Sequence, residues 1–182
     1  AAMIGRWRQA TSAGLEVTML ARTRHATALL NTMARAAMRD AGLIGSVDLV
    51  VVRADRRSHL GERAFAAGDA IICMRNRRLT QGRVRNGTLA TVIAANQVHL
   101  VVQTSTGQHL ELPNDYVAGF VDHGYAMTVH KSQGRTVGGP ATGGRSGLAL
   151  VWGADTMSAE AALVAASRAT DRTELFLSLI HI

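Results

Sequence analysis

The chain has 182 residues, 47% of them hydrophobic, which is enough to bury a sizeable core and excludes wholesale disorder. No apolar run reaches the roughly 20 residues that span a bilayer and no signal peptide is visible, so a cytoplasmic protein without a membrane partner is expected. The single cysteine, Cys73, excludes an internal disulfide and a multi-cysteine zinc site. Lys and Arg together number 20 against 13 Asp and Glu, and this +7 charge predicts a nucleic-acid partner.

The first part of the chain has an α/β pattern. Residues 17–21 and 47–52 are short apolar runs typical of buried strands. Between them, apolar residues recur at helical spacing from Arg24 to Asp40, and Gly42 is a natural stop. The sequence therefore predicts strand, helix and strand in this order.

Short strands separated by turn signals occupy residues 66–116. The turn signals are Gly68-Asp69, Asn86-Gly87 and Thr106-Gly107, and the strands between them are expected at 70–74, 88–94, 98–103 and 109–112. Strands of this length and spacing predict a small β-barrel inserted into an α/β domain.

The α/β pattern returns after Val117. A strand is expected at 148–152, then a helix capped by Ser158 that reaches about Thr170, then a last strand at 175–179. The predicted domains are 1–65 and 117–176, which form one α/β domain, and the inserted barrel at 66–116. Residues 177–182 resemble a translated sequencing adapter, so we expect the natural sequence to diverge there and the chain to be truncated at both ends.

Two segments concentrate the chemistry. Residues 124–136 read GYAMTVHKSQGRT, a strand-to-loop segment rich in hydrogen-bond donors and ending near a glycine, which suits phosphate or sugar binding. Residues 165–172 read AASRATDR and place Arg168 on an otherwise apolar helix, where an arginine is either a structural ion pair or a phosphate clamp. Taken alone, His130 is more typical of a histidine satisfied at the surface or in the core, and only its neighbours favour a binding role.

Together these segments resemble motifs V and VI of superfamily 1 helicases of the RecD-like branch. MLARTR near the start and GDAIICMRN and RNGTLATV in the middle are similar to the helicase half of conjugative relaxases of the TraA/TrwC (MobF) class. The resemblance covers roughly residues 3–176. It implies a P-loop NTPase-type (RecA-like) second motor domain with a barrel of the Src-homology-3 type, ATP and Mg²⁺ as cofactors, and single-stranded DNA as partner.

The resemblance also implies roles for matching positions. Arg168 corresponds to the arginine finger that stabilises charge on the transferred phosphoryl group. Gln133 and Gly134 correspond to nucleotide-binding positions. Contacts to DNA are implied for residues of motif V, of the first strand-to-helix corner and of the barrel: Thr128, His130, Lys131 and Ser132; Arg22 and Thr23; and Arg75, Arg77, Arg78, Arg83 and Arg85. A solvated barrel face explains the barrel arginines equally well.

The chain departs from the family pattern at several positions. Thr136 stands where superfamily 1 motors often have Glu, Gly138 where relaxase-helicases have Asp, and Leu163 where an aromatic opens motif VI. Residues 139–146 (GPATGGRS) resemble a P-loop with Arg145 in place of lysine, but a strand is expected next rather than a helix, which favours a flexible loop.

No other Walker A sequence, acidic Walker B run or histidine cluster for strand nicking occurs in the sequence. We therefore expect the ATP phosphates to be held by residues of a preceding motor domain, with this chain inactive alone. Three interpretations stay open: a relaxase-helicase fragment, a RecD-like repair helicase, and a non-catalytic nucleic-acid-binding module with a degenerate motor.

Overall fold

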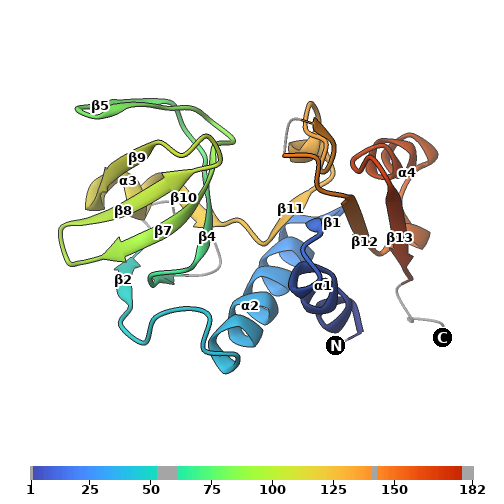
Figure 1. Ribbon diagram of the computed structural model, residues 1–182, viewed down its shortest axis with the longest axis horizontal. Coiled ribbons are helices and arrows are strands. Elements are labelled where there is room, and N and C mark those ends of the chain that lie inside the picture. The colour runs from blue at the N-terminus through green and yellow to red at the C-terminus, as the bar shows by residue number, and fades with distance from the viewer. Residues whose placement is uncertain (1, 53–60, 141–142, 178–182) are drawn as a thin grey trace. The chain divides into compact units, whose positions relative to one another are not determined.

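The structure is a computed structural model that describes residues 2–52, 61–140 and 143–177. The chain forms two compact units (Figure 1): residues 1–34 and 125–182 make an α/β unit, and residues 35–124 make a β-rich unit. The segment predicted as a barrel, 66–116, lies within the β-rich unit, and its boundaries stay a prediction. Most of the suspected adapter lies outside the described residues.

A four-stranded parallel sheet forms the centre of the α/β unit. Its order is β11–β1–β12–β13, and all three neighbouring pairs are parallel. The central strands β1 and β12 are almost entirely buried, as expected for parallel strands covered on both faces. The strands predicted at 17–21 and 148–152 are thereby confirmed. The bounds are β1 (Glu16–Ala21), β11 (Ala126–Thr128), β12 (Gly147–Trp152) and β13 (Arg172–Phe176).

Helix α1 (Ala2–Ser12), which we did not predict, packs against β1 and β12. It buries Met3, Ile4, Trp7 and Ala10, an apolar stripe at helical spacing. The Trp7 ring lies edge-on to Tyr125, with 5.7 Å between ring centroids. This helix closes one side of the sheet.

Helix α4 (Ala159–Ala166) begins as predicted, because the Ser158 hydroxyl accepts a hydrogen bond from the Ala161 N–H. It ends four residues before the predicted Thr170. The Ser167 hydroxyl and the Arg168 Nε both donate to the Val164 carbonyl, at 2.9 Å each, and so satisfy it without a further helical turn. The last strand accordingly starts at Arg172, earlier than predicted; predicted residues 178–179 lie outside the described ones.

Helix α2 (Arg24–Asp40) has the predicted bounds. Its first turn is capped by Thr23, whose hydroxyl accepts from the Ala26 N–H at 3.1 Å. Its end is a Schellman motif: Gly42 has φ +68°, and the Leu43 N–H donates to the Met38 carbonyl at 3.0 Å. The predicted glycine stop is confirmed.

The β-rich unit is built on a five-stranded antiparallel sheet of order β10–β4–β7–β8–β9. Two hairpins, β2–β3 and β5–β6, and helix α3 (Asn114–Phe120) complete it. The four predicted strands correspond to β4, β7, β8 and β9. The bounds are β2 (Leu49–Val52), β3 (Glu62–Phe65), β4 (Ala70–Cys73), β5 (Arg77–Leu79), β6 (Gly82–Val84), β7 (Leu89–Ala95), β8 (His99–Thr104), β9 (His109–Pro113) and β10 (Val121–His123).

One hydrophobic core holds these elements together. It includes Phe65 of β3, Leu100 of β8, Leu110 of β9 and Tyr116 of α3, all at most 1% exposed. Cys73 is buried in this core. The predicted turn glycines Gly68, Gly87 and Gly107 all have positive φ.

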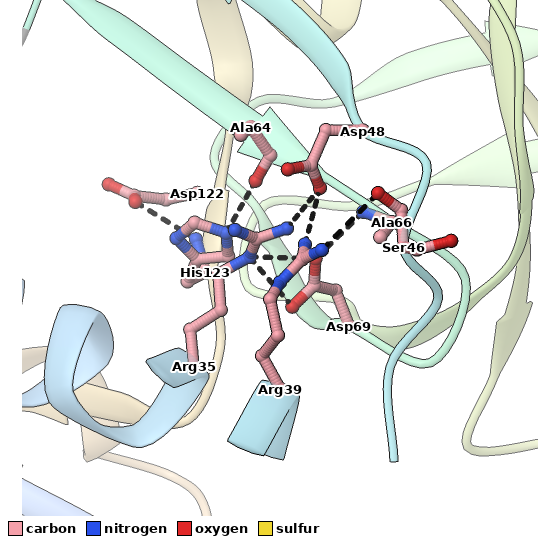
Figure 2. A network of polar contacts seen from close by, with 9 residues as sticks. All are labelled: Arg35, Arg39, Ser46, Asp48, Ala64, Ala66, Asp69, Asp122 and His123. Atoms are coloured by element: carbon pink, nitrogen blue, oxygen red, sulfur yellow. Dashed lines mark hydrogen bonds and ion pairs between the residues drawn. The ribbon is translucent and has the colours of Figure 1, made fainter. Parts of the chain in front are cut away.

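Ion pairs, one of them with the buried carboxylate of Asp69, anchor the last turns of α2 to the β-rich unit (Figure 2). The Arg35 Nε lies 3.1 and 3.0 Å from the two carboxylate oxygens of Asp69, which is completely buried. Arg35 and Arg39 also share the Asp48 carboxylate. These contacts explain why the chain divides within α2, after Ala34.

His123 belongs to the same network. Its Nε2 donates to the Ala64 carbonyl at 3.0 Å, and its ring lies 4.9 Å from that of Phe65. Burial lowers the pKa of His123, although the negative charge of Asp69 opposes the shift. Burial therefore favours the neutral form of the imidazole.

Candidate functional site

Three loops leave the parallel sheet at one edge of the α/β unit. Ala21, Thr128 and Trp152 end β1, β11 and β12, and Ala21 is the register partner of both other residues. The chain continues from them into Arg22, Val129 and Gly153. Because ligands of open α/β sheets bind outside the carboxyl ends of parallel strands, this edge is the candidate site.

The loop after β11 carries the motif V residues on one tight turn. It folds as the 3₁₀ helix η1 (His130–Ser132), and the Lys131 N–H donates to the Thr128 hydroxyl at 3.3 Å. The Val129 N–H donates to the Ala21 carbonyl at 3.0 Å, which fastens the loop to β1. Gly134 ends the turn with φ +77°. The predicted residues are thus brought together in one hydrogen-bonded loop.

The side chains of this loop differ in exposure. His130 and Gln133 are exposed, whereas Thr128 and Lys131 are half-buried. Ser132 is 2% exposed, and its hydroxyl donates to the Val129 carbonyl at 2.7 Å. The loop therefore presents an imidazole and an amide to solvent, while the Ser132 hydroxyl stabilises the turn itself.

Arg22 and Thr23 lie at the same edge, directly after β1. The Arg22 side chain is exposed and donates to the Thr156 carbonyl in the 3₁₀ helix η3 (Ala154–Thr156), which follows β12. The Thr23 hydroxyl caps α2, so its acceptor is already engaged in helix structure. Of the two, Arg22 offers the side chain for a ligand.

Arg168 is bound to the motif V loop. Its Nη1 donates to the carbonyls of Ser132 and Arg135, at 3.3 and 3.1 Å, and its Nη2 donates to the Ser167 hydroxyl at 2.7 Å. With the Nε bond to Val164, four of its five N–H groups are used. The fifth, on Nη2, has no acceptor among the described residues. Motif VI thus holds motif V through backbone carbonyls, a connection that the sequence did not reveal.

A close backbone crossing accounts for the glycine at the family's aspartate position. A Cβ on Gly138, where φ is +85°, would lie 2.4 Å from the Gly147 nitrogen and 2.2 Å from the Thr170 hydroxyl. Two carboxylates fix the crossing: Glu16 accepts from the Gly138 N–H and Asp171 from the Gly147 N–H, both at 2.7 Å. The Thr170 hydroxyl, which also bonds Asp171, lowers the pKa of that carboxyl.

The glycine-rich segment 139–146 is closed by a bridge between Gly139 and Arg145. Residues 141–142 lie outside the described residues. The segment leads into strand β12, so the helix that a P-loop requires does not follow it. This arrangement agrees with the interpretation of the segment as a loop.

The basic segment of the β-rich unit divides into two kinds of arginine. Arg75 lies over the Phe120 ring at 4.8 Å, and Arg77 lies over Tyr116 and pairs with Asp115 at 2.7 Å. The hydrogen bond from Arg77 lowers the pKa of Asp115. The other three, Arg78, Arg83 and Arg85, are exposed, and their side chains have no partner among the described residues.

The described residues contain no group of three His, Cys, Asp or Glu side chains able to hold a metal ion. Among the helices described, none is both long and apolar enough to cross a membrane.

Comparison with known proteins gives relatives of one kind. The chain is 35% identical over 122 residues to conjugal transfer protein TraA of Agrobacterium fabrum, a match that covers 65% of the chain. TraA of Rhizobium radiobacter is 32% identical over 139 residues, or 74% of the chain. The chain is homologous to a segment of TraA. It spans about a tenth of the length of these TraA relatives (10% and 12%).

The fold is that of Pif1 helicases. The Bacteroides Pif1 helicase in complex with ADP–AlF₃ and single-stranded DNA superposes with a TM-score of 0.62, covering 90% of this chain and 41% of that chain at 16% identity. The Candida albicans Pif1 helicase gives a TM-score of 0.56 over 89% of this chain and 45% of that chain, at 14% identity. No model of a known protein family matches the chain. The chain thus combines sequence homology to TraA with the mixed α/β fold of Pif1 helicases.

Proposed function

We propose that the chain is part of an ATP-dependent DNA helicase or translocase that moves along single-stranded DNA during conjugative plasmid transfer. The observation that carries the proposal is the guanidinium of Arg168 bonded to the loop that bears Thr128, His130 and Lys131. Arg168 and this loop are thus joined by hydrogen bonds, so that a cation for a nucleotide phosphate and side chains for binding a DNA strand belong to one structure. Homology to TraA and the Pif1 helicase fold support the same assignment.

The proposed division of labour follows the geometry. Arg168 acts as the arginine finger through its positive charge and its remaining Nη2 N–H, and Gln133 and Gly134 border the nucleotide. Thr128, His130, Lys131, Ser132, Arg22 and Thr23 form the strand-binding edge, with Ser132 and Thr23 acting through the loop and helix ends that they stabilise. In the β-rich unit, proposed as a Src-homology-3-type module, the DNA-binding positions are Arg75, Arg77, Arg78 and Arg85.

ATP and Mg²⁺ are assigned mainly to residues outside this chain, because the sequence contains no Walker A lysine and no acidic Walker B run. The partners proposed are a preceding motor domain of the same polypeptide and a relaxase domain beyond it. The fragment alone is expected to be inactive, and the complete polypeptide is expected to move 5′→3′.

The test uses the complete polypeptide, its DNA-stimulated ATP turnover and its affinity for an oligo-dT strand. Arg168→Ala should lower turnover by about 10³- to 10⁵-fold, the scale of an arginine finger, with a much smaller loss of strand affinity from releasing the Ser132 and Arg135 carbonyls that Arg168 holds. Arg145→Ala, in the glycine-rich loop, is the matched control and should keep turnover. Equal loss of turnover and strand binding in Arg168→Ala would instead make Arg168 a structural residue.

Lys131→Ala tests the strand-binding edge separately. Removing one phosphate contact should weaken binding and flatten the plot of log affinity against log salt by about 0.7. A complete polypeptide that binds DNA but never turns over ATP would leave only a nucleic-acid-binding module.

A further inference from the structure

The β5–β6 hairpin places two arginines directly opposite each other. Arg78 of β5 is the register partner of Arg83 of β6, and residues paired in this way project from the same face of an antiparallel ladder. Both side chains are exposed, and neither has a partner among the described residues. Like charges in this position destabilise a hairpin, and no carboxylate among the described residues pairs with either guanidinium.

The neighbouring arginines, Arg75 and Arg77, differ from Arg78 and Arg83 because their side chains have partners in helix α3. Arg77 is opposite Val84, which is completely buried, and its guanidinium is held by Asp115 and the Tyr116 ring. Arg75, just before β5, packs on Phe120. The alternation along the hairpin thus assigns Arg75 and Arg77 to the attachment of the hairpin to α3, and leaves Arg78 and Arg83 on the outer face.

The surroundings of this face favour a polyanion. No acidic residue occurs anywhere from Ala70 to Leu110, so the exposed arginines have no carboxylate from their own strands. A hollow of about 320 Å³ opens beside Arg78, and its polar lining consists of Arg77, Thr80, Gln81 and His99, which can donate hydrogen bonds, and of Glu111. Two phosphates of one strand, one beside each guanidinium, would offset the repulsion between Arg78 and Arg83 and accept hydrogen bonds from them.

We propose that Arg78 and Arg83 form a two-phosphate grip on the backbone of a nucleic-acid strand, independent of base sequence, and that Arg75 and Arg77 serve as its scaffold. The proposal rests on the proposed function in taking single-stranded DNA as the ligand. Among the five arginines of this segment, it selects Arg78 and Arg83 for direct contact with the strand and gives Arg75 and Arg77 a supporting role. It also predicts that the hairpin is more stable when DNA is bound.

The decisive variant is Arg83→Glu, tested in the 182-residue chain. It replaces a repulsive pair by an attractive one, so amide exchange in residues 77–84 without DNA should become about 1.5- to 5-fold slower, as a cross-strand pair term implies. Affinity for an oligo-dT strand should fall in the same variant. Faster exchange, or unchanged affinity, would overturn the proposal. If Arg83 only supported the fold, its replacement would lower hairpin stability and strand affinity together.

A second measurement counts the phosphates. Arg78→Gln combined with Arg83→Gln should flatten the salt dependence of oligo-dT binding by about 1.4, or 0.7 for each phosphate contact. Arg8→Gln is the control, since Arg8 is exposed on α1 and has no side-chain partner among the described residues. An unchanged slope in the double variant contradicts the grip.

The two proposals fail separately. If Lys131→Ala weakens binding and the hairpin variants do not, the strand-binding edge stands and the hairpin grip is wrong. If the hairpin variants weaken binding while the complete polypeptide never turns over ATP, the grip stands and the motor function is wrong.

Discussion

The buried pair of Arg35 and Asp69 gives the clearest stability prediction. Asp69→Asn keeps the shape of the side chain but removes the negative charge of a carboxylate that is 0% exposed. The two oxygens of this carboxylate lie 3.1 and 3.0 Å from the Arg35 Nε. Breaking such a pair from one side costs about 3–5 kcal/mol, because a buried charge is left unpaired. Arg35 is 15% exposed and keeps Asp48, so we expect a loss near the lower limit, about 3 kcal/mol.

The assay is unfolding in urea, monitored by amide hydrogen exchange in the β-rich unit. This readout reports on the β-rich unit by itself, as a chain of two units requires. Asp115→Asn is the control: its pair with Arg77 joins side chains that are 69% and 36% exposed, and its loss should cost less than about 1 kcal/mol. Arg35→Leu together with Asp69→Asn should be less destabilising than the sum of the single variants. Equal losses for Asp69→Asn and Asp115→Asn would refute the reasoning from burial.

Three further predictions concern other parts of the two units. Burial lowers the pKa of His123, and the charged groups around its imidazole are Asp69, Arg35 and Asp122. At a pH below the ordinary histidine pKa of about 6.5, the unfolded chain therefore binds a proton at this residue more readily than the folded chain does. The free energy of unfolding of the β-rich unit should therefore fall as pH drops from 7.5 to 5.5, and His123→Gln, but not the exposed His109→Gln, should reduce that dependence in urea titrations. Gly138→Ala should destabilise the α/β unit by at least about 2 kcal/mol in thermal unfolding, since it adds a backbone clash to positive φ, whereas Gly14→Ala, with φ +83° and open space, should cost about 1 kcal/mol. Asn31→Ala should cost about 2 kcal/mol or more because it leaves the buried Ala126 N–H and carbonyl without their amide partner, and Thr32→Ala beside it, on the exposed face, should stay below about 0.5 kcal/mol; a similar loss for both would contradict this.

Local signals account for the elements that the sequence predicted. Helix α2 has a repeating apolar stripe, a Thr23 cap and a Gly42 stop, and each of these acts within one or two turns. Strands β4, β7, β8 and β9 are separated by glycines whose positive φ makes them turns. Both signals are independent of the rest of the fold, which is why they could be read from the chain alone.

The elements that were missed or misplaced depend on distant partners. Helix α3 has seven residues, too few for a helical period to stand out, and it is held by Tyr116 and Val117 in the core. Strand β13 takes its position from pairing with β12, so its start is fixed by register and not by its own composition. The contact of Arg35 with Asp69 joins residues 34 positions apart and leaves no periodic trace in the sequence. Tertiary contacts decide these cases.

In the candidate site, too, local sequence patterns predicted one part and tertiary contacts decided the other. The segment Thr128–Gly134 could be located because its residue types are unusual together, and the pairing of β1 with β11 then places Arg22 at the same edge. What the sequence could not supply is the partner of Arg168, because its acceptors are carbonyls of Ser132 and Arg135, which every residue type possesses. This matters for the proposed motor. If Arg168 binds a phosphate through its remaining N–H group, as proposed, the same guanidinium also holds the carbonyls of Ser132 and Arg135 in the proposed strand-binding loop. A shift of Arg168 during nucleotide turnover would then move that loop, which is how the proposed motor would couple nucleotide to strand.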